Sequence, residues 1–358
     1  MSPPILGYDF YHLWAAGRAT LEGSDPYSVA AIKPIMATLG WQPDEVVFGF
    51  LHPPWTLWLF ALFALLPFQL SLIIWLALTV VALIACLWWC LDKIQILAPN
   101  AALRSQDVIF AAICFPPFFS TLMRGQTNHL LILGVLLAVI LLEGGSALAA
   151  GVVFSLALVK PQFVIGPGII LLVRYASGLR IKFALGVGLG LAIQALISMA
   201  LFPSAFAAFN IALQSVGSAA LMLPGASLRQ AILPTGIDLG NWPFIICTGL
   251  SLVAALSRQI PNLSALGISV ALACLGAPYA WPHSLLLLFP FYLTLLDGIW
   301  RRSSLAGTAL VVGFAFIGVL DLLRPALLAA FFLLLPLAVL INSMWTQVSI
   351  LKDMAPAK

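Results

Sequence analysis

A few polar side chains in an otherwise apolar sequence could carry out chemistry. Asp9 is a lone carboxylate in an aromatic-rich stretch at the start of the chain, and Lys160 begins Lys160-Pro161-Gln162. Two further motifs, 124–129 (RGQTNH) and 277–283 (APYAWPH), add an arginine, two amides and two histidines. A carboxylate can accept a proton from an attacking hydroxyl, and cations can hold a phosphate and stabilise it as it leaves. Together these side chains predict transfer of a phosphate-linked group to a hydroxyl.

Each of these side chains also has a structural interpretation. Asp9 could cap the helix expected over residues 10–21, and Arg124 and Lys160 could be anchors at a membrane surface. We favour a role in chemistry for Asp9 and leave both roles open for the two cations.

The amides and histidines are ambiguous in the same way. Gln126 and Asn128 could hydrogen-bond neighbouring helices or cap a turn, which we rank slightly ahead of ligand binding. His283 could cap a helix or sit at an interface, and both of its roles stay open. Asp25, in Ser-Asp-Pro-Tyr, is first of all a turn former.

The composition predicts an all-α polytopic membrane protein that forms a single integral domain over residues 1–358. Hydrophobic residues make up 63% of the chain and the mean hydropathy is +1.11, whereas soluble domains contain about 45–50% apolar residues. Apolar runs of roughly 20 residues, long enough to cross a bilayer, recur along the sequence. About eleven crossings are expected, at 69–91, 108–123, 127–143, 146–160, 161–177, 183–202, 241–257, 264–276, 284–300, 305–323 and 326–346.

The segment 53–91 is too long for one crossing at 1.5 Å per residue. Pro67 divides it, so we interpret 53–67 as a re-entrant or interfacial helix; two full crossings would invert everything that follows. The single-crossing topology places residues 1–52 outside as a loop of short helices. The other expected regions are core helices (69–202), an external loop (203–240), C-terminal helices (241–346) and a cytoplasmic tail (347–358).

The distribution of positive charge favours this topology, because loops on the cytoplasmic side are enriched in Lys and Arg. It leaves six basic residues outside, namely Arg18, Lys33, Arg124, Lys160, Arg229 and Arg324. Ten lie inside, namely Lys93, Arg104, Arg174, Arg180, Lys182, Arg258, Arg301, Arg302, Lys352 and Lys358. All of the motifs described above then fall on the outer side.

An outward N-terminus requires a preceding helix to carry it across the membrane, and residues 1–8 contain neither a signal peptide nor an anchor. We therefore expect a first helix to be missing and Met1 to be a misplaced or truncated start. The five cysteines lie in apolar segments without metal-ligand companions, so no disulfide, metal or cofactor is expected.

At these motifs the chain resembles the family-87 glycosyltransferases, a branch of the GT-C superfamily of multi-pass membrane enzymes. The matching pieces occur in the family's order. They are Asp9-Phe10 with Trp14-Ala15-Ala16-Gly17, Gly23-x-x-Pro26-Tyr27, Leu51-His52-Pro53-Pro54, Gly125-Gln126-x-Asn128, Lys160-Pro161-Gln162, and Pro278-Tyr279-Ala280-Trp281 before His283.

The resemblance implies a GT-C-like bundle in the inner or plasma membrane, with its active site on the periplasmic or extracellular side. It implies transfer of a hexose, with mannose the first candidate, from a polyprenyl-phosphate donor to a lipid or glycan acceptor. The transfer would invert the anomeric centre, with Asp9 as general base. The family's functional histidine maps onto His283, although Pro282 and Ser284 flank it where the family often has an acidic residue or a histidine.

We assign the remaining motif residues to the two substrates. The donor phosphate and sugar are expected to contact Arg124, Lys160, His283, Gln126 and Asn128. The acceptor, or a secondary part of the site, is expected to involve Arg18, Asp25, Tyr27, Tyr279 and Trp281. No nucleic-acid partner is expected.

Two other classes of protein remain as alternatives. A secondary transporter or a flippase of a lipid-linked substrate would place ionisable groups near the middle of its helices, and those regions are nearly free of charge here. The other alternative is a non-catalytic assembly or lipid-scaffold protein.

Overall fold

The computed structural model describes residues 6–42, 47–97, 103–221, 225, 227–323 and 334–341, and within them it is helical with no strand. The helices are α1 (Tyr8–Leu21), α2 (Val29–Thr38), α3 (Leu57–Ala64), α4 (Phe68–Leu97), α5 (Ser105–Ile113), α6 (Pro116–Arg124), α7 (Asn128–Glu143), α8 (Ala147–Ala157), α9 (Pro161–Ile170), α10 (Arg180–Leu201), α11 (Ala205–Leu221), α12 (Leu228–Ile232), α13 (Trp242–Leu256), α14 (Asn262–Gly276), α15 (Phe289–Arg302) and α16 (Ser304–Leu323). Short tight helices occur at η1 (Pro54–Thr56), η3 (Leu233–Thr235) and η4 (Pro282–Leu288), and a π-helical turn at η2 (Leu171–Tyr175).

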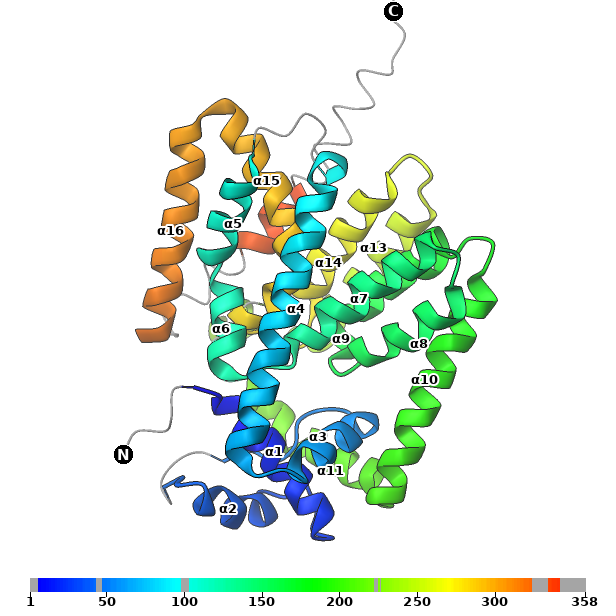
Figure 1. The fold of residues 1–358 in the computed structure, drawn as a ribbon, viewed down its shortest axis with the longest axis vertical. Coiled ribbons are helices and arrows are strands. Elements are labelled where there is room, and N and C mark those ends of the chain that lie inside the picture. Colours follow the sequence, from blue (N-terminus) through cyan, green and yellow to red (C-terminus); the bar gives the residue numbers. More distant parts are fainter. Residues whose placement is uncertain are drawn as a thin grey trace, which may run out of the picture.

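The elements are arranged around two long helices that join opposite ends of the molecule (Figure 1). Helices α1, α2, α3 and α11 gather at one end, which we call the α1 end. From there α4 runs to the opposite end, and α10 returns to the α1 end along the other side. The remaining helices lie between and beside these two, so the turns before α7 and α9 face the α1 end.

Among the described residues, three helical segments are long and apolar enough to cross a membrane: Phe68–Asp92, Arg180–Leu201 and His283–Arg302. The pair α5 and α6 would form a fourth, bent by 50° where Pro116 and Pro117 begin α6, because proline cannot continue the hydrogen bonding of a helix. The described part of the chain also contains shorter apolar helical stretches of 10–17 residues. The expectation of membrane helices is confirmed, and the count of about eleven crossings stays a prediction.

The N-terminal stretch packs as an aromatic cluster against the start of α4. The rings of Phe10 and Trp75 stack with centroids 5.1 Å apart, and Phe63 meets Trp75 edge-on at 5.1 Å. Gly17 lets α1 approach α3 closely, because a Cβ there would lie 2.1 Å from the carbonyl oxygen of Phe60. Buried aromatic pairs of this kind contribute beyond their area, so α1 is held firmly in place.

The structure differs from the sequence expectation in the stretch 203–240, which was expected to be an external loop. It contains α11, a helix of 17 residues, and the shorter α12. Ala205 and Ala212 are buried against the aromatic cluster, and Phe209 lies 5.7 Å from the ring of Tyr27. The apolar residues of α11 thus find a protein partner at the α1 end.

Helix α3 spans eight residues, or about 12 Å, and is too short to cross a bilayer. Its placement at the membrane surface stays a prediction. Of the expected last crossing, 326–346, residues 334–341 are described and helical. Arg324 and the expected tail 347–358 lie outside the described residues.

Small residues bring α8 and α10 into backbone contact. A Cβ on Gly151 would lie 2.1 Å from the carbonyl oxygen of Phe183, and one on Gly186 would lie 2.1 Å from that of Leu148. Such close contact between small residues is typical of helix pairs in membranes. It fixes the position of α8, which leads into the turn that carries Lys160.

We therefore predict that Gly186→Ala destabilises the purified protein by about 1–3 kcal/mol, the usual cost of overpacking. Gly188→Ala on the same helix is the matched control, because a Cβ there meets nothing within 4 Å and alanine favours helix. Thermal unfolding in detergent should show a lower Tm for Gly186→Ala only. Equal Tm values for both variants would contradict the close α8–α10 contact.

Candidate functional site

Asp9, Gln126, Asn128 and Lys160 come from distant parts of the chain and form one hydrogen-bonded group at the α1 end. The side-chain amide of Gln126 donates to Oδ2 of Asp9. Its oxygen Oε1 accepts from Nζ of Lys160 at 2.7 Å, and the same ammonium donates to Oδ1 of Asn128 at 2.8 Å. The carboxylate and the ammonium are therefore joined through a single amide, whose oxygen must face the cation and whose nitrogen must face the anion.

The backbone before Gln126 brings this amide to Asp9. Gly125 ends α6 with φ +66°, and a Cβ there would lie 2.9 Å from Cβ of Phe10 and 3.2 Å from Cα of Gly7. The indole of Trp75 donates to the carbonyl of Gly125 at 2.8 Å. Glycine is thus required here both for its left-handed conformation and for the approach of α1.

Lys160 lies in the turn between α8 and α9 and is only 8% exposed. Because burial disfavours the charged form, the pKa of its ammonium is lowered to about 7, a shift that the nearby Asp9 opposes. Lys160 can therefore change charge near neutral pH.

The backbone and ring of His283 approach the group from η4. Its carbonyl accepts from Nδ2 of Asn128 at 2.5 Å and from Oγ1 of Thr121 at 3.4 Å. The side chain is 3% exposed, and within the described part of the chain neither ring nitrogen has a hydrogen-bond partner. A buried imidazole without a partner costs free energy, so a substrate is a natural partner for it.

Aromatic residues lie next to His283. The ring of Trp281 is 5.9 Å from that of His283 and 5.2 Å from that of Tyr279. The hydroxyl of Tyr279 bonds to the side chain of Gln162, two residues after Lys160, and burial raises the pKa of this phenol.

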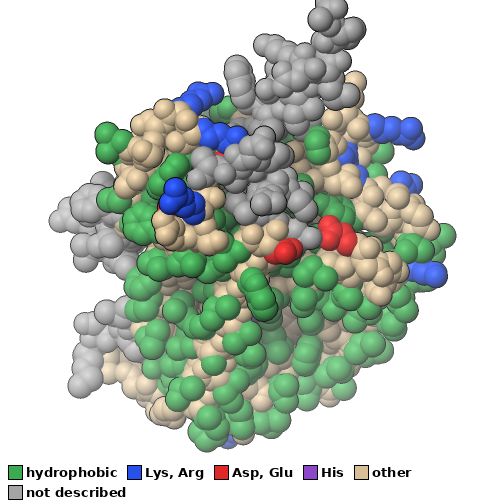
Figure 2. Space-filling view, turned by 45° about the horizontal axis from the view of Figure 1, so that its top comes forward, with side chains coloured by type: hydrophobic (Ala, Val, Ile, Leu, Met, Phe, Trp, Pro, Cys, Tyr) green, Lys and Arg blue, Asp and Glu red, His purple; other side chains and the backbone are tan. Residues whose placement is uncertain are grey.

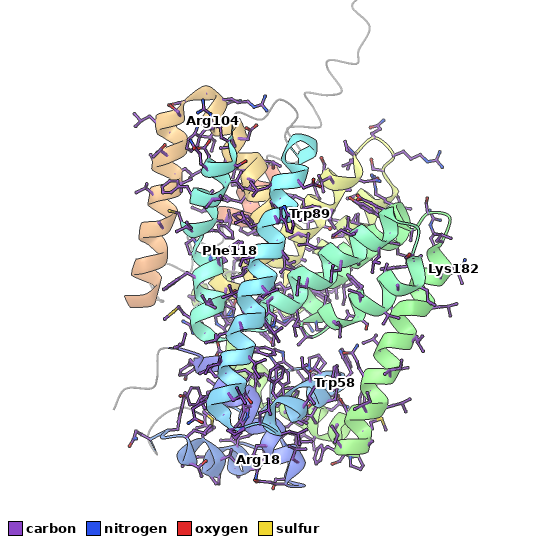
Figure 3. The ribbon with its side chains drawn as sticks, viewed as in Figure 1. Arg18, Trp58, Trp89, Arg104, Phe118 and Lys182 are labelled. Atoms are coloured by element: carbon purple, nitrogen blue, oxygen red, sulfur yellow. The ribbon has the colours of Figure 1, made fainter. Side chains whose placement is uncertain are left out.

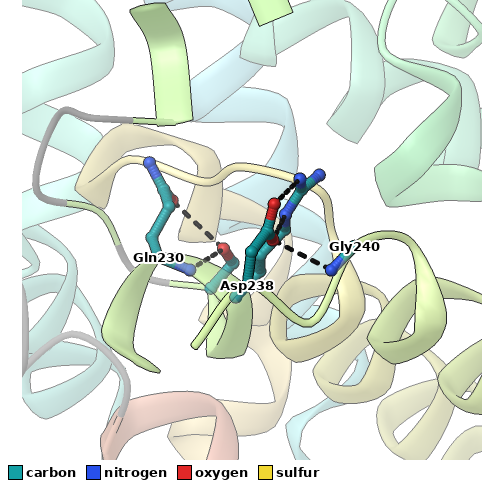
Figure 4. Close-up of polar contacts among 5 residues, drawn as sticks. Gln230, Asp238 and Gly240 are labelled. Carbon is teal, nitrogen blue, oxygen red and sulfur yellow. Dashed lines mark hydrogen bonds and ion pairs between the residues drawn. The ribbon is translucent and has the colours of Figure 1, made fainter. Parts of the chain in front are cut away.

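The segment that carries these rings is held by residues of the connection between α11 and α13. Oε1 of Gln230 accepts from the backbone N–H of Ala280 at 2.7 Å and from the hydroxyl of Ser227 at 3.1 Å. Next to it, Arg229 pairs with Asp238, which also accepts from the N–H of Gly240 (Figure 4).

The structure does not bring three of the predicted residues into the group. Arg18 forms an exposed pair with Glu22 at 2.7 Å and lies nine residues, or about 13 Å, along α1 from Asp9 (Figure 3). Asp25 accepts from the N–H of Tyr27 at 2.9 Å, as in an Asx turn, and Tyr27 packs against Phe50. Arg124 is half-buried at the end of α6, and its charge acts on His283.

Thr121 and Trp75 also contribute to the site, and neither was expected from the sequence. Thr121 is fully buried and bonds to His283, and the indole of Trp75 positions Gly125. The only sequence feature that could have indicated Thr121 is weak: it is a hydroxyl inside an apolar segment. The sequence contains no signal that would have selected Trp75 among 11 tryptophans.

The chain matches a known protein family. Residues 50–281 match the model of glycosyltransferase family 87, which is more than half of the chain. The chain belongs to glycosyltransferase family 87. The resemblance noted in the sequence is thereby confirmed, and with its apolar helices the protein is a membrane glycosyltransferase. No curated protein and no solved structure matches the chain.

The family match covers Arg124, Gln126, Asn128 and Lys160, and it ends two residues before His283. Asp9 lies ahead of it. The direct contact of Asp9 with Gln126 therefore connects the N-terminal helix of this glycosyltransferase to the matched region.

We predict that Gly125→Ala lowers transferase activity severely, because the new methyl group would push α1, and Asp9 with it, away from Gln126. Gly145→Ala is the matched control: Gly145 also has a positive φ, +77°, but a Cβ there meets nothing within 4 Å. Both variants bear the left-handed strain, roughly 1–2 kcal/mol, so their Tm values should both fall. Activity should fall only in Gly125→Ala, and equal activities would argue against the closeness of α1.

We also predict that activity falls as the pH rises through about 7, because Lys160 is charged below that pKa and neutral above it. Asp9, His52, His129 and His283 all interact electrostatically with Lys160. Lys160→Arg separates its contribution, because arginine stays charged at all accessible pH values. The alkaline limb should be absent from the kcat/KM profile of Lys160→Arg, and the same limb in both proteins would assign it to another group.

Proposed function

We propose that this family-87 enzyme transfers a hexose, with mannose the first candidate, from a polyprenyl-phosphate donor to a hydroxyl of a lipid or glycan acceptor, inverting the anomeric centre. The observation that supports it is the link between Asp9 and Lys160 through Gln126. This link holds a proton acceptor beside a cation at the α1 end.

Asp9 acts on the acceptor as the general base. Among the described contacts only Oδ2 of this half-buried carboxylate has a hydrogen bond, so Oδ1 is available to take the proton of the acceptor hydroxyl. The hydroxyl oxygen then bonds to the anomeric carbon while the bond from that carbon to the phosphate oxygen breaks. A single displacement with one carboxylate inverts the configuration.

The donor side falls to the cations and to His283. The departing lipid phosphate carries the electron pair of the broken bond, and Lys160 can stabilise that charge within an environment of low dielectric constant. Arg124 and the imidazole of His283 lie within electrostatic reach of this position. The polyprenyl chain would lie along the apolar helices that surround the group.

The distribution of charge supports an active site on the outer face. Basic side chains cluster at the end opposite α1 (Figures 2 and 3). Figure 3 shows Arg104 and Lys182 away from the α1 end, and the ends of α10, α13 and α15 that lie away from it carry or precede Arg180, Arg258, Arg301 and Arg302. Because cytoplasmic loops are enriched in Lys and Arg, that end would be cytoplasmic, and Asp9 would face the periplasm or the exterior.

We predict that Asp9→Asn reduces sugar transfer by about 10²–10⁴-fold, the usual contribution of a general base, while the protein still inserts and folds. Membranes that contain each variant are incubated with radiolabelled polyprenyl-phosphate-mannose, and the labelled lipid or glycan product is quantified. Glu22→Gln is the matched control, because it removes a carboxylate from the exposed end of the same helix.

Unchanged transfer by Asp9→Asn would remove Asp9 as the base. Label that crosses the membrane of sealed vesicles without becoming attached to an acceptor would instead support the alternative, a flippase or transporter. Labelling only from another polyprenyl-phosphate hexose would keep the mechanism and change the sugar.

A further inference from the structure

A segment far from Lys160 in the sequence binds the turn that carries it. The ring nitrogen Nδ1 of His52 lies 3.2 Å from the carbonyl oxygen of Val159. Nε1 of Trp55 donates to the carbonyl of Leu158 at 3.1 Å. Two side chains from one short segment thus bond to two successive carbonyls immediately before Lys160.

These carbonyls need partners from outside their own helix. Helix α8 ends at Ala157. The carbonyls at the end of a helix have no N–H donor within that helix. Pro161 follows Lys160 and restricts its backbone to extended conformations. The bonds from His52 and Trp55 on one side and the proline on the other leave the backbone of Lys160 little freedom.

The 52–55 segment is itself held on the N-terminal half of the protein. The hydroxyl of Tyr27 donates to the carbonyl of His52 at 3.4 Å, and Oγ1 of Thr56 donates to that of Pro53 at 2.7 Å. The ring of His52 lies 5.6 Å from that of Phe50 and 6.0 Å from that of Phe60. A restrained segment of this kind can fix a turn that packs on it.

We propose that His52 and Trp55 are positioning residues of this transferase: they hold the turn at 158–160 so that the ammonium of Lys160 meets Gln126 and Asn128. The inference rests on the proposed role of Lys160 at the donor phosphate. It adds a role for a segment whose described bonds to this turn, from His52 and Trp55, end on backbone carbonyls.

The protonation state of His52 suits this role. A carbonyl can only accept, so Nδ1 must carry the hydrogen. Burial, and then the nearby charge of Lys160, lower the pKa of His52 to about 3, so the ring stays neutral above that pH. The bond to Val159 is therefore maintained throughout the pH range in which Lys160 titrates.

The test begins with Trp55→Phe, which keeps a ring but removes the indole donor. We expect it to lower kcat/KM for polyprenyl-phosphate-mannose by between about 10-fold and 100-fold, the scale of a small misplacement of a reacting group. Trp14→Phe is the matched control, because it removes an indole-to-carbonyl bond of 3.3 Å, to Leu66, elsewhere at the α1 end. Trp14→Phe should keep wild-type kcat/KM.

His52 is tested with a pair of variants. His52→Asn retains an N–H near the position of Nδ1 and should keep most of the activity, whereas His52→Leu has no donor and should lose as much as Trp55→Phe. In His52→Leu and Trp55→Phe the freed ammonium gains access to water. The alkaline limb of the pH profile should then move from about 7 toward the ordinary lysine value of about 10.4.

A double-mutant cycle separates positioning from a general loss of stability. In the Lys160→Met background, His52→Leu should cause no further loss of the residual transfer, because its effect passes through Lys160. A further loss as large as in the wild-type background, or an unmoved pH limb in Trp55→Phe, would overturn the proposal. These outcomes are independent of Asp9→Asn, so the proposed reaction can stand while the positioning role falls.

Discussion

The site depends on how the protein hydrogen-bonds the ammonium of Lys160, which is buried away from water. A buried cation is tolerated only when paired or hydrogen-bonded. Lys160 meets this requirement with two amide oxygens, and one of those amides reaches on to Asp9. Neutral amides stabilise the charge less than a direct ion pair would, which leaves the ammonium able to respond to an anionic ligand.

The surrounding elements can be understood as supports for this arrangement. The aromatic cluster around Phe10 and Trp75 fixes α1, the glycine contact of α8 with α10 fixes the helix before Lys160, and Gly125 brings the two halves together. Each support is an apolar or backbone contact. The polar group therefore rests on packing that does not change with pH.

Much of this could be read from the sequence, because polar residues are conspicuous in a chain with 8% charged residues. The motifs at Asp9, Gln126 and Lys160 were expected on one side of the membrane, and the structure brings them into contact. Arg18 lies outside the hydrogen-bonded group, and the sequence of α1 does not reveal which of its turns faces that group. The bonds from His52 and Trp55 end on the backbone carbonyls of residues 158 and 159. Every residue type has such a carbonyl, so the sequence does not indicate these bonds. Helix α11 was missed because its burial depends on the distant Tyr27.

The lowered pKa of Lys160 also bears on inhibitor design. Near neutral pH a substantial fraction of this amine is unprotonated and hence nucleophilic, as buried lysines can be. An aldehyde or an activated ester carried on an apolar tail would suit the apolar helices around this amine. Such a compound would modify Lys160 covalently in preference to lysines that face water.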